Sequence, residues 1–277
     1  MTAANPCSQS EDEDEEGRVL LCANKGECEV EPESDANDGT LRRRCHCPIG
    51  FGGSSCEEEV LLLNPHSAFM SGQSFLAFDN SYLTQANQGF EYLRFNLKTK
   101  NENSSSENRF NRLLVYYGQP PESTNGRDYL AVVITTDGGL VMLYELGSGE
   151  GRVVFSPADQ LPLLNDDKVH LVEVKLTGRE GQLTVDGSFR ASGRSTGALT
   201  VLNVDADIFI GGVVDYRALP SSVKKVLVNG TVDSQTQSRF SGYSGCIWDI
   251  TIGRSDVLDL KESSKRSRNI APCDAQS

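Results

Sequence analysis

The chain has 277 residues, of which 38% are hydrophobic, and its formal net charge at pH 7 is −13. This length allows one large domain or two smaller ones, and no apolar run approaches the roughly 18 residues that a membrane-spanning helix needs. The excess of acidic side chains excludes the basic surface that is typical of a nucleic-acid-binding protein.

The cysteines are distributed unevenly. Six of the eight lie between Cys7 and Cys56, and the other two are Cys246 and Cys273. An even number crowded into so short a segment predicts a disulfide framework and an oxidising compartment. The first residues, MTAANPCSQSEDEDEE, contain neither the basic segment nor the apolar segment of a secretory signal. We therefore expect a piece of a longer secreted or cell-surface protein, located in the extracellular matrix.

The negative charge is concentrated near the N-terminus. Residues 1–60 hold 15 acidic and 5 basic side chains, a net charge of −10, whereas the remaining 24 acidic and 21 basic side chains give −3. The run EDEDEE (11–16) is typical of a solvated loop. With few large apolar residues, this first segment cannot be stabilised by burial alone and needs cross-links.

The cysteines of RRRCHCPIGFGGSSC (42–56) come in a close pair and a third residue. In an extended chain Cys45 and Cys47 lie about 6.6 Å apart, at the outer limit of disulfide reach, so each more readily takes a separate partner. The spacing alone leaves the connectivity of the six cysteines open. A zinc site at Cys45-His46-Cys47 is the competing interpretation, but its ligand spacing differs from that of the usual zinc sites.

The order of the six cysteines, ending in C-x-C-x-x-G-F-x-x-x-x-C, resembles an epidermal-growth-factor-like (EGF-like) module. The resemblance implies the pairs Cys7–Cys28, Cys22–Cys45 and Cys47–Cys56. The acidic cluster that precedes the first cysteine of calcium-binding EGF-like modules is missing, and Glu27 stands where a fucosylated module has Ser or Thr. The resemblance thus implies a structural spacer at residues 1–60, followed by a linker at residues 61–67.

From Ala68 onward, short apolar or alternating runs are separated by Gly, Asn, Asp and Pro. Alternation with period 2, as in Leu93, Phe95 and Leu97, indicates strands with one buried face. The predicted strands cover residues 91–99, 112–118, 129–135, 140–146, 170–176, 182–187, 208–212 and 246–252. We find no amphipathic helical stretch of useful length and predict an all-β, antiparallel sandwich over residues 68–277, with long loops at 98–111 and 215–241.

Several motifs of this second unit occur in the order found in laminin G-like domains, which are concanavalin-like jelly rolls. They are LLVYYG, DYLAVVI, LYELGSGEG, GQLTVDG, IFIGG and SGYSGCIWDI. The resemblance implies a closing disulfide Cys246–Cys273. Val169 stands where the family usually has Trp before His170, and we expect a repacked core there. An EGF-like module followed by such a domain is most similar to the C-terminal parts of basement-membrane proteoglycans of the perlecan and agrin type.

Laminin G-like domains commonly bind one calcium ion at the rim of the sandwich. The resemblance implies Asp128 and Asp205 as side-chain ligands, with the backbone carbonyls of Leu146 and Asn203. Ca²⁺ takes about six to eight oxygen ligands and is held weakly in extracellular modules. Asp207 is the alternative to Asp205 but lies nearer the sheet. By composition alone, all three aspartates would be ordinary strand-edge or turn residues.

Basic side chains at this rim would add charge-assisted contacts to an acidic glycan. The candidates are Arg127, Arg217, Lys224 and Lys225, which could equally be scattered solvated side chains. The basic run KESSKRSR (261–268) is expected to be a solvated segment. Sequons at Asn103 and Asn229, in the two long loops, predict N-glycosylation sites.

The leading hypothesis is a non-catalytic extracellular adhesion module. Through its laminin G-like face it would bind a dystroglycan-like receptor glycan, an integrin-like receptor or another matrix component. One alternative is a carrier of a small apolar ligand between the sheets. The other is a glycoside-active jelly roll, which requires two carboxylates facing a cleft, and the strands carry no such pair of acids. We therefore predict that the chain is not an enzyme.

Overall fold

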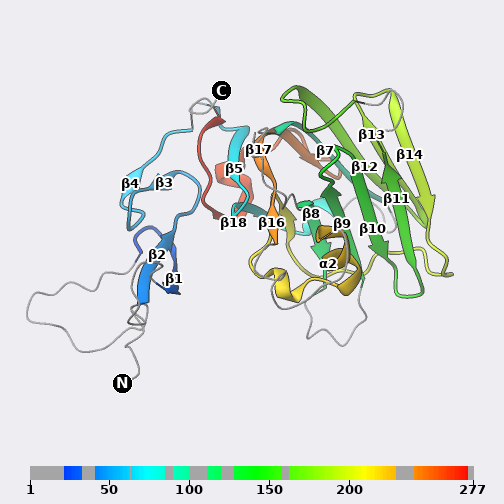
Figure 1. The fold of residues 1–277 in the computed structure, drawn as a ribbon, viewed down its shortest axis with the longest axis horizontal. Helices are drawn as coiled ribbons and strands as arrows, with labels where there is room; N and C mark the ends of the chain where they lie inside the picture. The colour runs from blue at the N-terminus through cyan, green and yellow to red at the C-terminus, as the bar shows by residue number, and fades with distance from the viewer. Residues whose placement is uncertain are drawn as a thin grey trace, which may run out of the picture.

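The computed structural model describes residues 22–32, 41–62, 64–84, 90–99, 111–119, 128–156, 162–228 and 240–273. These residues form a small N-terminal module beside a β-sandwich (Figure 1). Several sequence predictions lie outside the described residues: the acidic run 11–16, Cys7, Arg127, Asn103 and Asn229.

The N-terminal module consists of two short antiparallel sheets. The first pairs β1 (Glu27–Pro32) with β2 (Leu41–His46), and the second pairs β3 (Phe51–Gly52) with β4 (Glu58–Glu59). The disulfides Cys22–Cys45 and Cys47–Cys56 have the pairing that the EGF-like resemblance implies. Cys28 is disulfide-bonded as well. The module is consistent with an EGF-like fold, in which cross-links replace a large core.

The sandwich consists of two large sheets whose strands, with one exception, pair antiparallel. The eight-stranded sheet has the order β11 (Glu150–Phe155), β10 (Leu140–Glu145), β9 (Tyr129–Ile134), β8 (Arg112–Gly118), β15 (Ile208–Ile210), β6 (Phe75–Phe78) and β18 (Ser264–Arg268), with β16 (Ser241–Gly242) parallel to β8. The six-stranded sheet has the order β14 (Phe189–Arg194), β13 (Glu180–Val185), β12 (Val169–Thr177), β7 (Phe90–Thr99), β17 (Ser244–Ile252) and β5 (Ser67–Ser71).

The core lies between the two sheets and is built by the alternation seen in the sequence. Leu93, Phe95 and Leu97 of β7 point inward and are at most 1% exposed. Burial of one such side chain stabilises the fold by about 1.5–3 kcal/mol. The buried Tyr144 is accommodated because its hydroxyl donates to the Arg179 carbonyl at 2.7 Å. The disulfide Cys246–Cys273 joins β17 to the C-terminal segment. The predicted antiparallel β-sandwich is confirmed.

Some elements were absent from the sequence prediction because they are short or polar. The run 261–268, expected to be a solvated segment, forms the helical turn α3 (Leu260–Ser263) and the edge strand β18, with Lys261, Glu262, Lys265 and Arg266 exposed. β18 pairs with β6, and its cations are ion-paired. β5 begins at Ser67, the last residue of the predicted linker.

The expected loop at 215–241 contains a 3₁₀ turn (Tyr216–Ala218) and the helix α2 (Ser221–Leu227). α2 lies on the outer face of the eight-stranded sheet, in front of β9 and β10 in Figure 1. Its Val223 and Leu227, one turn apart, are completely buried in a second apolar cluster. The sandwich is thus covered on this side by a third layer. A further helical turn, α1 (Ser81–Thr84), follows β6.

The expectation of a repacked core at Val169 is wrong. Val169 is 56% exposed, because it points away from the other sheet, and the neighbouring His170 is buried. Within the described part of the chain, no helix is long and apolar enough to cross a membrane.

The N-terminal module packs against the C-terminal edge of the sandwich. The Asn269 amide donates to the Cys47 carbonyl at 2.9 Å, and the Ile49 amide donates to Ser267 Oγ at 2.7 Å. Ile49 is 6% exposed and belongs to the core cluster of the sandwich. Figure 1 shows the module beside β18. The two units therefore share one continuous interface.

Candidate functional site

The four predicted calcium ligands come from three segments that meet at one edge of the eight-stranded sheet, namely the edge formed by the ends of its strands and not by an outermost strand. Asp128 directly precedes β9, Leu146 directly follows β10, and Asn203 and Asp205 precede β15. β9 and β15 flank β8 and both run antiparallel to it, and β10 runs antiparallel to β9. The starts of β9 and β15 therefore lie at the same edge as the ends of β8 and β10.

Asp128 is held in a defined position at this edge. The residue is only 3% exposed, and its carboxylate oxygen Oδ2 accepts a hydrogen bond from the Asn203 amide at 2.9 Å. The Gln119 amide donates to the Asp128 carbonyl at 3.0 Å, and Gln119 Nε2 donates to the Asn203 carbonyl at 2.9 Å. These bonds join the Asp128 and Asn203 segments, and the Asn203 carbonyl keeps a second lone pair.

The chain after β10 passes directly beside the Asp128 carboxylate. Gly147 has a φ of +88°, and a Cβ at this position would lie 3.2 Å from Asp128 Oδ1. Both the left-handed backbone and the close approach favour glycine. The preceding Leu146, whose carbonyl is a predicted ligand, is thereby brought to the same edge.

The electrostatic environment of Asp128 disfavours its own charge. Burial raises its pKa above the ordinary value, and the nearby charge of Glu145 raises it further, against the lowering effect of the Asn203 hydrogen bond. No Lys, Arg or His of the described residues forms an ion pair with Asp128. A bound cation would offset the unfavourable burial of this anion.

The other two aspartates differ in their surroundings. Asp205 is exposed and accepts a hydrogen bond from Asn80 Nδ2 at 3.1 Å. Asp207 instead forms ion pairs with Lys265 Nζ at 2.9 Å and with Arg266 at 3.0 Å. A calcium ion at Asp207 would have to replace two cationic partners, whereas Asp205 forms no ion pair with the residues that the structure describes. Asp205 therefore suits a metal better than Asp207 does.

The donor atoms available at this edge are all oxygens, which are the ligands that calcium prefers. Among the described residues, no group of three or more His, Cys, Asp or Glu side chains could hold a metal on its own. A cation here would depend on the two carboxylates together with backbone carbonyls and water. The residues present fit a weak extracellular calcium site.

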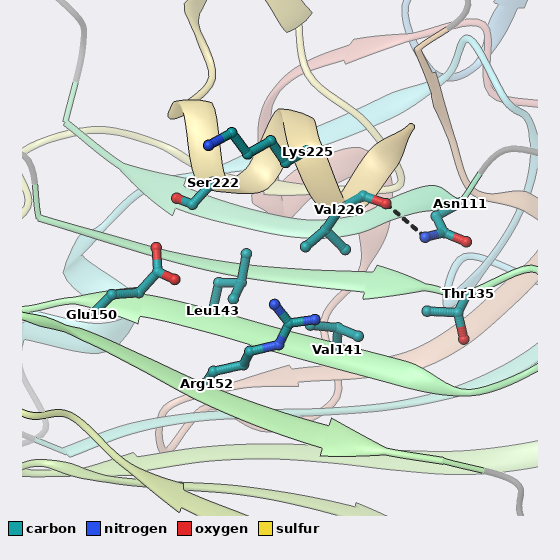
Figure 2. Close-up of a pocket in the computed structure, with 9 residues that line it drawn as sticks. All are labelled: Asn111, Thr135, Val141, Leu143, Glu150, Arg152, Ser222, Lys225 and Val226. Atoms are coloured by element: carbon teal, nitrogen blue, oxygen red, sulfur yellow. Dashed lines mark hydrogen bonds between the residues drawn. The ribbon is translucent and has the colours of Figure 1, made fainter. Parts of the chain in front are cut away.

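The predicted basic contacts are distributed differently from the expectation. Arg217 Nε donates to Asp215 at 2.9 Å, and Lys224 Nζ donates to the Arg217 carbonyl at 3.1 Å. These two cations are thus held by local partners. Lys225 instead lines a groove beneath α2 (Figure 2).

The groove has a volume of about 610 Å³ and lies between α2 and the strands β9, β10 and β11. Its lining residues are Asn111, Thr135, Val141, Leu143, Glu150, Arg152, Ser222, Lys225 and Val226 (Figure 2). This groove was not predicted from the sequence, because the pattern of residues 215–241 predicts a long loop and no helix. The signal that could have found the helix is Val223 and Leu227, four residues apart and shortly after Pro220.

The family model described as "Laminin G domain" matches residues 92–255, from β7 to just beyond β17. The chain belongs to the laminin G domain family. This match covers most of the sandwich, including the edge that carries Asp128, Leu146 and Asp205. The N-terminal module lies before it and has the disulfides described above.

Curated relatives of this laminin G chain include "Basement membrane proteoglycan" of Caenorhabditis elegans, which is 30% identical over 83% of the chain and 6% of the relative. "Pikachurin" of Bos taurus is 25% identical over 99% of the chain and 22% of the relative. The mouse "Basement membrane-specific heparan sulfate proteoglycan core protein" is 26% identical over 86% of the chain and 6% of the relative. The chain thus spans less than a quarter of each relative.

The laminin G fold is also found among solved structures. Mouse laminin alpha1 chain, domains LG4-5, matches with a TM-score of 0.54 and 20% identity, covering 77% of this chain and 50% of that chain. The LG1-3 region of the laminin alpha2 chain matches with the same TM-score of 0.54 at 19% identity, covering 75% of this chain and 34% of that chain. At these identities the likeness establishes the fold alone.

Proposed function

We propose that this laminin G chain is a non-catalytic adhesion module of the extracellular matrix. The disulfides of both units suit an oxidising compartment. Two of its relatives are named as basement membrane proteoglycans. A role in the same kind of matrix follows for this chain, with a cell-surface glycan, a receptor or another matrix component as its partner.

The proposed partner site is the edge of the sandwich with one calcium ion. Asp128 and Asp205 would supply carboxylate oxygens, and the carbonyls of Leu146 and Asn203 would complete the protein ligands. The observation that carries this proposal is the buried Asp128 carboxylate, which has Glu145 as a charged neighbour and no cationic partner among the described residues. When bound, calcium would leave positions open for the acidic oxygens of a partner glycan.

Neither alternative function is favoured by a specific observation. The space between the sheets is filled by large, fully buried side chains such as Phe95, Tyr144 and Phe155. The groove described above lies outside that space, on the outer face of the eight-stranded sheet. A small apolar ligand would therefore have to displace core residues.

The experiment is a calcium titration monitored by thermal melting, with wild type and Asp128→Asn. At a calcium concentration ten times the dissociation constant, wild type should gain about 1.4 kcal/mol, which corresponds to a rise of roughly 3–6 °C in Tm. Asp128→Asn should lose this rise. In chelator, the variant should melt no lower than wild type, because it removes a buried charge but keeps an acceptor for the Asn203 amide.

Asp207→Asn is the matched control, since it makes the same chemical change at a carboxylate already paired with Lys265 and Arg266. It should keep the calcium response. A response that survives in Asp128→Asn and disappears in Asp207→Asn would assign the metal to the other aspartate. The absence of any response in wild type would contradict the calcium site itself. Binding to an array of acidic glycans, with calcium and with chelator, then tests the partner class.

A further inference from the structure

The outer face of the six-stranded sheet is accessible where β7 and β17 lie side by side. α2 covers the outer face of the other sheet, whereas the outward side chains of β7, from Tyr92 to Lys98, are all at least partly exposed. On this open face lies Trp248 of β17, the only tryptophan of the chain. Its partner in the register of β7 is Asn96, so the two side chains stand next to each other.

A β-bulge in β17 brings a further side chain to the same face. The register with β7 shifts between Trp248 and Thr251, and Asp249 within this bulge has a φ of +54°. Aspartate tolerates the left-handed conformation better than most residues do. Asn96 Nδ2 donates to Asp249 Oδ2 at 3.0 Å. Trp248 and Asp249 therefore both lie on the outer face, which two consecutive residues of a regular strand cannot do.

The polar groups around Trp248 keep unused hydrogen-bonding capacity. Trp248 itself forms no side-chain hydrogen bond, ring stacking or cation–π contact with the described residues, and its indole N–H is not buried. Asp249 forms no ion pair with the described residues, and its Oδ1 is left to accept. Arg94, exposed and paired in register with Thr251, also forms no ion pair within the described part of the chain. We call Trp248, Asp249, Asn96 and Arg94 the Trp248 cluster.

The charges of the Trp248 cluster narrow the class of ligand that it suits. A polyanion would be repelled by Asp249, and a basic segment would be repelled by Arg94. β7 and β17 are each paired on both sides, so neither offers a free edge to an added peptide strand. An uncharged sugar avoids both repulsions, because each hydroxyl can donate to a carboxylate and accept from a guanidinium. The apolar C–H face of its ring matches the face of an indole.

We propose that the Trp248 cluster binds an uncharged oligosaccharide. One sugar ring packs on the indole of Trp248, and its hydroxyls form hydrogen bonds with Asp249, Asn96 and Arg94. The cluster belongs to the sheet that does not carry Asp128. The site needs no metal and goes beyond the proposed calcium-dependent function.

A second aromatic ring on the same face favours a chain of sugars over a single one. Tyr92 is partly exposed and lies four residues before Asn96 on β7, a distance of about 13 Å along the strand. Its hydroxyl donates to Glu173 Oε1 at 2.7 Å, which fixes the ring on the sheet. A single sugar ring cannot reach from Trp248 to Tyr92, whereas a short oligosaccharide can.

The test is an NMR titration of the full chain, uniformly labelled with ¹⁵N, in chelator. Because the chain has one tryptophan, its indole N–H gives a single resonance that reports directly on the site. The probes are five neutral trisaccharides: maltotriose, cellotriose, mannotriose, galactotriose and N-acetylchitotriose. The proposal expects that at least one of them shifts the indole resonance and the side-chain amide of Asn96 in a saturable way.

Three variants test the assignment with the trisaccharide that binds. Trp248→Leu should abolish saturable binding, followed at the side-chain amide of Asn96. Asn96→Ala should weaken binding about fivefold, as the loss of one hydrogen bond would give. Gln182→Ala is the matched control, because it truncates a partly exposed amide on the same face of β13, with β12 between it and β7. It should bind as wild type does, and thermal melting in chelator checks that all three variants fold.

Three outcomes would overturn the proposal. They are an absence of saturable shifts with all five trisaccharides, unchanged affinity in folded Trp248→Leu, and tighter binding of a heparin-derived disaccharide or of tri-lysine at the indole. The last outcome would assign the cluster to a charged partner. Because the titration contains no calcium, failure of the calcium site at Asp128 would leave these results unchanged.

Discussion

At the scale of single residues, His170 shows how a buried charge is accommodated in this sandwich. The residue is 4% exposed, with Nδ1 at 2.9 Å from Asp186 and Nε2 at 3.0 Å from Asp166. Ionised carboxylates only accept hydrogen bonds, so both ring nitrogens must carry protons. Burial lowers the pKa of His170, but the bonds to Asp166 and Asp186 outweigh burial and raise it above the ordinary value of 6.5.

The pH dependence of stability follows from this raised pKa. The imidazolium of His170 contributes fully to the free energy of unfolding below pH 6.5, and this contribution is lost as the pH rises through the pKa of His170 in the folded state. His170→Gln cannot carry the charge. Its destabilisation, measured by urea unfolding, should therefore be larger at pH 6 than at pH 9, by roughly 1.5 kcal/mol for a hydrogen bond between charged groups.

A difference in the free energy of unfolding between wild type and His170→Gln that is the same at both pH values would show that the imidazole stays neutral.

At acidic pH, the neighbouring Asp166 determines the dependence. Burial raises the pKa of Asp166, but hydrogen bonds from His170 and Lys168 outweigh burial and lower the pKa to about 2. The carboxylate contribution is therefore present above the ordinary Asp value of 3.8 and lost as the pH falls toward 2.

At the scale of elements, α2 is short and depends on the sheet for its stability. A helix of two turns is marginal in isolation. Val223 and Leu227 bury its inner side against the sheet. Asn111 accepts from the Thr136 amide at 2.8 Å and donates to the Val226 carbonyl, so it links the helix end to the strands.

Two valines of α2 provide a matched test of this packing. Val223 is completely buried, whereas Val226 is partly exposed at the groove. Val223→Ala should lower the free energy of unfolding by about 1.5–3 kcal/mol, and Val226→Ala by less than about 1 kcal/mol. Chemical denaturation measures both. Equal small losses would mean that α2 is not packed on the sheet.

At the scale of the whole molecule, a histidine joins the N-terminal module to the sandwich. His46 is 2% exposed, with Nε2 at 2.6 Å from Glu29 and Nδ1 at 3.0 Å from Asn269 Nδ2. The Asn269 amide donates to Nδ1, so the neutral ring donates to Glu29 from Nε2. Burial lowers the pKa of His46, and the charges of Arg268 and Arg44 lower it further, against the effect of Glu29.

Acidification should therefore weaken the contact between the N-terminal module and the sandwich. Because the folded-state pKa of His46 lies below 6.5, the stability of this interface is complete above pH 6.5 and is lost as the pH falls below it. We expect the rotational correlation times of the two units, from ¹⁵N relaxation, to agree at pH 7.5 and to diverge at pH 5.5. In His46→Gln, which cannot be protonated, the ratio should not depend on pH. Equal tumbling of both units at both pH values in wild type would contradict the prediction.

The sequence by itself determined eight strands of the sandwich, their buried faces and the disulfide-rich character of the first unit. The reason is that alternation along a strand and the crowding of cysteines are local properties of the chain. The spacing of Leu93, Phe95 and Leu97 is sufficient to assign them to the core. Asp128 and Asp205 could be proposed as ligands because the motifs around them resemble those of laminin G domains.

Only the tertiary structure decided which of these residues meet. The pairing of Asp207 with Lys265 and Arg266 joins residues 58 and 59 positions apart, and the groove requires α2 to lie over β10. The basic run of β18 has a polar composition, yet its contacts with β6 and with the N-terminal module make it an edge strand. Such contacts join segments distant in sequence, and their energies depend on the packing of the whole chain, which no local pattern contains.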